Sequence, residues 1–147
     1  MIIESNTTQQ KIIGYLPTTT TNGGSYRSEL TGIYAALTHL LATTEVHNIK
    51  EGIVNVHCDN EKAILLSSIT GSRLPLKTSH ADIVHLIRAT VIKLPTTTKF
   101  QHIYGHQDKW LPYTSLPRPA QLNVICDKLA KTGLKRDISL NNTIQDI

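Results

Sequence analysis

Aromatic side chains, cysteines and long apolar runs are all scarce in this sequence. Aromatic residues make up 5% of the 147 residues, so a surface built for base stacking is not indicated. The two cysteines, Cys58 and Cys126, match neither a disulfide framework nor a zinc-binding pattern, and we expect two reduced, partly buried thiols. No apolar run has the length of a membrane span, and the first ten residues lack the basic start of a signal peptide. We therefore expect an intracellular protein, nuclear or cytoplasmic, with no membrane partner.

The residues that are present have the composition of an ordinary globular domain. Hydrophobic residues make up 39% of the chain and charged residues 18%, and the length is sufficient to bury a core. The net charge of +4 is compatible with a nucleic-acid partner, although many unrelated domains are equally basic. We expect one domain over residues 1–135 and a C-terminal tail over residues 136–147.

The spacing of apolar residues predicts an α/β fold, with helices packed on a mixed sheet. Helical spacing, turn residues and prolines set the expected boundaries. The expected elements are a hairpin from 2–4 and 11–16, a loop at 17–24, a helix at 25–42 capped by Ser25, a strand at 52–58, helices at 61–69 and 80–94, a strand at 99–104, and a last helix from Pro119 to near Gly133. We expect the strands 52–58 and 99–104 to belong to one sheet.

Three acidic residues occupy positions where an ordinary surface acid would not be expected. Glu29 continues an inward-facing stripe of the first helix, where a carboxylate is costly unless it is paired, although the helix dipole also favours a Glu near a helix start. Asp59 follows an apolar strand, where catalytic groups collect in α/β sheets, but it could instead cap the next helix. Asp127 lies in the middle of the last helix, a place that its side chain disfavours.

Taken together, the three acids indicate a carboxylate cluster for hard divalent cations. Oxygen ligands are the ones that Mg²⁺ prefers, and it keeps water molecules that substrate phosphates can replace. Two such ions can activate a water molecule and stabilise the leaving oxygen of a phosphodiester. We therefore expect the carboxylates of Glu29, Asp59 and Asp127 to lie close enough to share metal ions.

Four segments, in order, resemble the successive motifs of ribonuclease H domains of retrotransposon reverse transcriptases, the type 1 ribonuclease H family. These segments are SYRSELTGIYAAL, VHCDN, HIYGHQD and AQLNVICDKLAK, and the resemblance covers roughly residues 1–133. It implies a ribonuclease H-like mixed sheet flanked by helices. It also implies two Mg²⁺ or Mn²⁺ ions, hydrolysis of the RNA strand of an RNA–DNA hybrid, and a partner in the reverse transcriptase domain of the same element.

The resemblance assigns roles to five residues of this sequence. By that carry-over Glu29, Asp59 and Asp127 are catalytic metal ligands, His106 assists proton transfer or product departure, and Asn60 contacts the minor groove of the hybrid. Without the surrounding motif, His106 would be read as a simple loop histidine. The nearby His102 and Asp108 receive no role.

One departure from the family pattern concerns the start of the sequence. The family begins with a strand that carries an Asp followed by Gly-Ser, and that Asp bridges both metal ions. No Asp precedes Glu29 here, and Glu4 is the only earlier acid. Two interpretations stay open: the first strand is missing from an N-terminally truncated, impaired domain, or Glu4 substitutes for the absent ligand.

Three classes of function follow from these observations. The first is a metal-dependent endonuclease of the ribonuclease H type, or its impaired form. The second is a non-catalytic nucleic-acid-binding or scaffold remnant of a retroelement polyprotein. The third is a transposase or integrase core, which ranks last because that class carries Glu as its last acid and lacks the GHQD loop.

Overall fold

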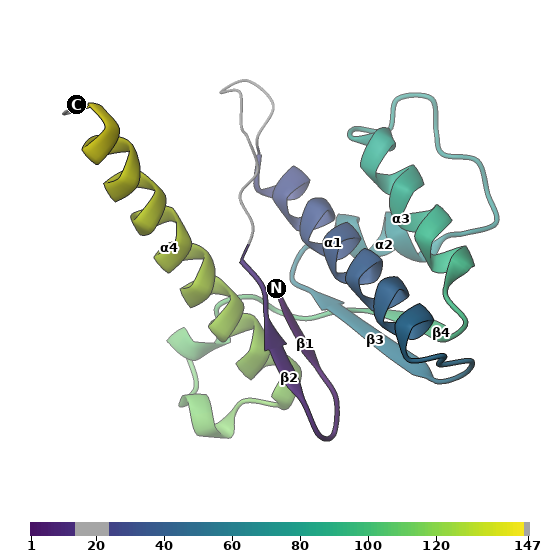
Figure 1. Ribbon diagram of the computed structural model, residues 1–147, viewed down its shortest axis with the longest axis horizontal. Helices are drawn as coiled ribbons and strands as arrows, with labels where there is room; N and C mark the ends of the chain where they lie inside the picture. The colour runs from purple at the N-terminus through teal and green to yellow at the C-terminus, as the bar shows by residue number, and fades with distance from the viewer. Residues whose placement is uncertain (14–23, 146–147) are drawn as a thin grey trace. The chain divides into compact units, whose positions relative to one another are not determined.

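The computed structural model describes residues 1–13 and 24–145, with side chains described up to Gly133. The chain is mixed α/β, which confirms the α/β class (Figure 1). Its described strands form two separate two-stranded sheets, one antiparallel and one parallel, and not the single mixed sheet that was expected. It divides into two compact units, one formed by Thr18–Ile103 and one formed by Met1–Pro17 with Tyr104–Ile147. No helix among the described residues has both the length and the apolar character that crossing a bilayer requires.

The unit Thr18–Ile103 is built on two parallel strands. Strand β3 (Ile53–Cys58) pairs with strand β4 (Thr97–His102), from Ile53 opposite Thr97 to Cys58 opposite His102. The prediction that these two segments share one sheet is therefore confirmed. Strand β4 begins and ends two residues earlier than expected, because the β-branched Thr97 and Thr98 extend the pairing toward Pro95.

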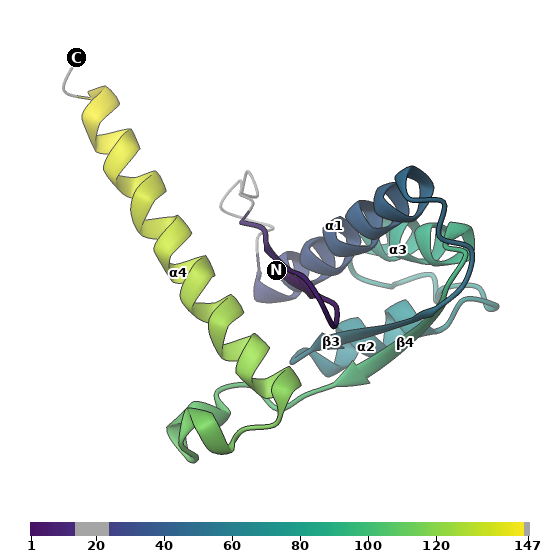
Figure 2. The ribbon, with the colours of Figure 1, turned by 60° about the horizontal axis from the view of Figure 1, so that its bottom comes forward.

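Helices α1 (Ser25–Val46), α2 (Glu61–Ser68) and α3 (Ala81–Lys93) complete this unit, and α1 and α3 run side by side (Figures 1 and 2). Leucines of α1 and apolar residues of α3 meet Cys58 and the first residues of α2 in one core. Its buried members are Leu30, Ile33, Leu37, Cys58, Ala63, Ile64, Ile83, Val84, Ile87 and Leu94. Because Glu29 directly precedes Leu30, this packing places Glu29 at the border of the core.

Helix α1 differs from its prediction at both ends. Gly24, with extended backbone, occupies the N-cap position, so Ser25 is the first helical residue and not the cap. The helix continues past residue 42 to Val46, and the hydroxyls of Thr43 and Thr44 donate to carbonyls of the preceding turn. It ends in a Schellman motif, in which Asn48 adopts a left-handed φ of 52° and the Ile49 amide donates to the Thr44 carbonyl at 2.9 Å.

Helix α2 starts at an asparagine cap, and this cap can be tested. The Asn60 side-chain oxygen accepts from the Ala63 amide at 3.1 Å. Asn60→Ala is expected to lower the free energy of unfolding by about 1 kcal/mol, because one amide of the first turn loses its acceptor. Denaturant titration measures the change. Asn55→Ala, an exposed position on β3, serves as the control and should stay within about 0.5 kcal/mol.

The second unit contains the hairpin, two short 3₁₀ turns and the last helix. Strands β1 (Ile2–Glu4) and β2 (Gln9–Lys11) pair antiparallel, so the predicted hairpin is confirmed with an earlier second strand. The turn is tighter than expected, because the Ser5 hydroxyl accepts from the Thr7 and Thr8 amides. Residues 14–16 of the predicted strand and residues 17–23 of the predicted loop lie outside the described residues.

The region 105–119, between the last predicted strand and the last predicted helix, contains the 3₁₀ turns η1 (Gln107–Lys109) and η2 (Tyr113–Ser115). Helix α4 (Arg118–Gln145) follows, with a small core from Leu116, Ala120 and Val124. The prediction that this helix ends near Gly133 is wrong. A glycine inside a helix costs about 1 kcal/mol but does not stop it, and no proline follows Gly133. The helix therefore continues into the segment predicted as a tail, and the division at residue 135 stays a prediction.

Candidate functional site

Two of the three predicted acids lie together at the carboxyl end of β3. Glu29 of α1 and Asp59, which follows β3, each offer a carboxylate oxygen to a group that also includes the Cys58 sulfur. The three atoms all lie within 4.8 Å of one another, and both carboxylates belong to half-buried residues. We call this group the Glu29–Cys58–Asp59 cluster. It lies where parallel strands end, the position at which α/β sheets commonly hold ligands.

The convergence of Cys58 and Asp59 depends on where the strand stops. Consecutive residues of a strand point to opposite faces of the sheet. Cys58 is the last residue of β3, and the chain bends at Asp59. The bend brings the Asp59 carboxylate to the side on which Cys58 and Glu29 lie.

Cys58 is the member of the cluster that sequence reasoning missed. Its thiol is only 5% exposed, and its sulfur donates to Oε2 of Glu29 at 3.4 Å. Burial, with a smaller contribution from the Glu29 carboxylate, raises the pKa of the Cys58 thiol to about 12. The thiol is therefore protonated at neutral pH and acts as a hydrogen-bond donor. The only signal in the sequence was its position directly before Asp59.

Asn60 and not Asp59 caps helix α2, so the alternative explanation of Asp59 as a helix cap is wrong. The Asn60 side-chain oxygen is engaged by the Ala63 amide, and the predicted contact of Asn60 with a nucleic acid stays a prediction. Because Asn60 caps the helix, the Asp59 carboxylate does not, and it belongs to the Glu29–Cys58–Asp59 cluster.

The other two predicted site residues meet in the second unit. His106 has a left-handed φ of 54° at the start of η1, and its Nδ1 lies 3.5 Å from Oδ2 of Asp127 in α4. Both side chains keep access to solvent, at 58% and 34% exposure. Sequence reasoning assigned separate roles to these residues and did not foresee that they pair. Asp127 belongs to the unit Met1–Pro17 with Tyr104–Ile147, whereas Glu29 and Asp59 belong to the unit Thr18–Ile103, so the convergence of all three carboxylates stays a prediction.

Glu4, the acid considered as a substitute ligand, is paired with Arg118 of α4. Nε of Arg118 donates to Oε1 of Glu4 at 2.9 Å and Nη2 donates to Oε2. Gln9 adds a third donor to Oε2, at 2.6 Å. The Arg118 hydrogen bonds, followed by the one from Gln9, lower the pKa of Glu4 from 4.5 to about 2. Both carboxylate oxygens are engaged within their own unit, which argues against Glu4 as a metal ligand.

Because of the Glu4–Arg118 pair, the free energy of unfolding depends on pH in the acid range. Because folding depresses the pKa of Glu4, its contribution is full above pH 4.5 and is lost as the pH falls through about 2. In Arg118→Gln we expect the pKa of Glu4 to rise toward 4.5, and to stop short because Gln9 still donates. A carboxyl NMR titration measures this shift. Arg27→Gln, which removes a partner of Asp82, should leave the Glu4 titration unchanged.

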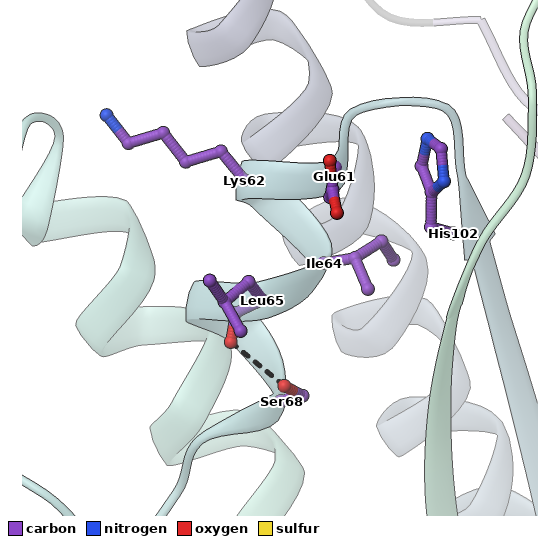
Figure 3. Close-up of a pocket in the computed structure, with 6 residues that line it drawn as sticks. All are labelled: Glu61, Lys62, Ile64, Leu65, Ser68 and His102. Atoms are coloured by element: carbon purple, nitrogen blue, oxygen red, sulfur yellow. Dashed lines mark hydrogen bonds between the residues drawn. The ribbon is translucent and has the colours of Figure 1, made fainter.

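A pocket of about 420 Å³ lies beside α2 and the end of β4 (Figure 3). Its walls come from Glu61, Lys62, Ile64, Leu65, Ser68 and His102. In Figure 3, Ile64 extends toward the strand that carries His102, whereas Lys62 extends away from it. Nε2 of His102 donates to the main-chain oxygen of Asp59 at 3.2 Å. His102, expected to have no role, therefore links the end of β4 to the residue that follows β3.

No protein-family model, no curated protein and no solved structure matches this chain.

Proposed function

We propose that this chain is a ribonuclease H-type domain that hydrolyses the RNA strand of RNA–DNA hybrids with the help of divalent cations. One observation carries the proposal. Carboxylates from two distant points of the sequence, Glu29 and Asp59, lie within 4.8 Å of each other at the carboxyl end of β3. Like charges this close are unfavourable unless a cation or a proton compensates them. The four ordered motifs supply the family and the substrate class.

Two of the three ligand atoms in the Glu29–Cys58–Asp59 cluster suit a hard divalent cation. Glu29 and Asp59 each offer a carboxylate oxygen, the ligand type that Mg²⁺ and Mn²⁺ prefer, while Cys58 offers sulfur. When bound, such ions would polarise the phosphodiester and make a water molecule more acidic. In this proposal Glu29, Asp59 and Asp127 hold the ions, as the family resemblance implies.

The His106–Asp127 pair supports a role in proton transfer. In the proposed arrangement the Asp127 carboxylate receives a hydrogen bond from Nδ1 of His106, which fixes the ring orientation and leaves Nε2 available. Nε2 could then deliver a proton to the departing oxygen or take one from water. The Asn60 side-chain oxygen accepts a hydrogen bond at the helix cap. The side-chain amide nitrogen of Asn60 is therefore the atom that would contact the minor groove.

A non-catalytic nucleic-acid-binding domain is the second candidate, because no Asp precedes Glu29 in the sequence. Residues 1–147 thus supply three of the four carboxylates that the family pattern requires. The reverse transcriptase domain of the same retroelement is the proposed protein partner in either case.

Cleavage of a labelled RNA–DNA hybrid tests the proposal. We expect residues 1–147 alone to cleave weakly or not at all with Mg²⁺ or Mn²⁺, because they lack the Asp that, by the family pattern, would help to hold both ions. Fusing an N-terminal strand that ends in Asp-Gly-Ser is expected to raise both metal binding and cleavage. An extended chain that binds the hybrid yet never cleaves it would favour the non-catalytic candidate. If it neither binds nor cleaves, the proposal fails.

A further inference from the structure

Exposed aromatic side chains are concentrated between residues 104 and 113, which we call the aromatic segment. Trp110, the only tryptophan of the chain, is 84% exposed, and Tyr104 and Tyr113 are exposed as well. The chain contains few aromatic residues, but three of its seven lie within this short segment. Tryptophan is highly buried on average, and exposed apolar side chains that gather on a surface mark sites of interaction. The aromatic segment is therefore a candidate contact surface.

The backbone of the aromatic segment is held by hydrogen bonds and by packing within its own unit. The Trp110 and Leu111 amides both donate to the Gln107 carbonyl, and the turn η1 lies against α4 (Figure 2). Directly after the segment, Leu116 is buried in the small core of α4. This unit thus has a core that takes up Leu116, and Trp110 nevertheless faces solvent.

The charges of this unit favour a nucleic acid as the partner of the aromatic segment. The described side chains of the unit include five lysines and arginines but only three acids. Two of those acids are already paired, one with Arg118 and one with His106. Lys109, directly before Trp110, is exposed and makes no ion pair with a described residue. A lysine beside an exposed ring can bind a phosphate while the ring stacks on a base.

We propose that Trp110 stacks on an unpaired base of a single strand that continues from the RNA–DNA hybrid, with Lys109 at a neighbouring phosphate. The inference rests on the proposed function, because it extends the contact with the hybrid to the strand beside it, and His106 lies within the same segment. Stacking requires an unpaired base, since the bases of a duplex are covered by their neighbours. Every base has an aromatic face, so this contact would not select a sequence.

Tryptophan fluorescence tests the contact directly, because Trp110 is the only tryptophan. The wild type is titrated with single-stranded oligoadenylate of about ten nucleotides, and with a hybrid that has or lacks a single-stranded extension. We expect the oligoadenylate and the extended hybrid to quench the emission, and the blunt hybrid to quench it much less. Trp110→Ala should weaken the binding of a labelled oligoadenylate at least about fivefold, and Trp110→Phe, which retains a ring, should weaken it less. Leu111→Ala changes the exposed apolar neighbour and should bind like the wild type.

Since Trp110 is exposed, its substitution should leave the fold intact, and circular dichroism checks this. The inference is overturned if the wild type does not bind oligoadenylate, if it binds without quenching, or if Leu111→Ala loses as much affinity as Trp110→Ala. A blue shift that depends on protein concentration alone would also overturn it, because the segment would then be an interface between two copies. Quenching by oligoadenylate in a chain that never cleaves a hybrid supports the contact and counts only against the proposed hydrolysis. Hybrid cleavage that is unchanged in Trp110→Ala, with no quenching in the wild type, does the reverse.

Discussion

Replacing Leu30 by alanine is expected to lower the free energy of unfolding by about 3 kcal/mol. Leu30 is 0% exposed and lies in the core that joins α1 and α3 to the end of β3. The substitution removes buried apolar surface and leaves a cavity that well-packed neighbours fill only in part. Because small domains are stable by roughly 5–15 kcal/mol, the loss is a large fraction of the total.

Chemical denaturation followed by circular dichroism measures this loss. Leu76→Ala is the matched control, since Leu76 carries the same side chain with 106% relative exposure and should change stability by less than about 0.5 kcal/mol. Equal effects of the two substitutions would mean that the core described for the unit Thr18–Ile103 is wrong. The result also bears on the site, because Glu29 directly precedes Leu30.

Asp59→Asn is expected to reduce Mn²⁺-dependent cleavage of the RNA strand by a factor on the order of a hundred or more, in the chain extended by the Asp-Gly-Ser strand. The substitution retains the shape of the side chain and removes the charge that would hold the ion. Asn60 and not Asp59 caps α2, so the fold should tolerate the change.

Asp108→Asn is the control for this experiment. It makes the same chemical change at an exposed acid, outside the cluster, to which the sequence assigned no role. Gel-resolved cleavage of a labelled hybrid gives the rates of both variants. Full activity in Asp59→Asn would remove Asp59 from the proposed mechanism, and a comparable loss in Asp108→Asn would point to a nonspecific effect of charge.

The elements of the unit Thr18–Ile103 could be predicted from the sequence because local signals agree with the packing. Apolar residues of α1 and α3 recur at helical spacing, and Pro95 lies between the end of α3 at Lys93 and the start of β4 at Thr97. The predicted ends of helices α1 and α4 were wrong, because the spacing of apolar residues does not show where these helices stop. Helix α1 continues to Val46, beyond the last of its regularly spaced apolar residues, and α4 continues through Gly133 because a single glycine weakens a helix without ending it.

Single residues of the candidate site could be predicted from the sequence, but the contacts between them could not. The inward position of Glu29 and the place of Asp59 after an apolar strand were sufficient to select both acids. The participation of Cys58 depends on a bend after the last strand residue, which the alternation of a regular strand does not foresee. Likewise, the pairing of Glu4 with Arg118 joins residues 114 positions apart, and no local pattern marks such a contact.

The proposed binding of a divalent cation by Glu29 and Asp59 is tested most directly by NMR with Mn²⁺. A bound paramagnetic ion broadens the amide signals of nearby residues. Substoichiometric Mn²⁺ should therefore broaden the signals of Glu29, Cys58 and Asp59 first in the wild type and spare them in Asp59→Asn. Broadening confined to exposed acids such as Asp82 and Asp108, with Glu29 and Asp59 unaffected, would show that these two carboxylates do not hold the ion.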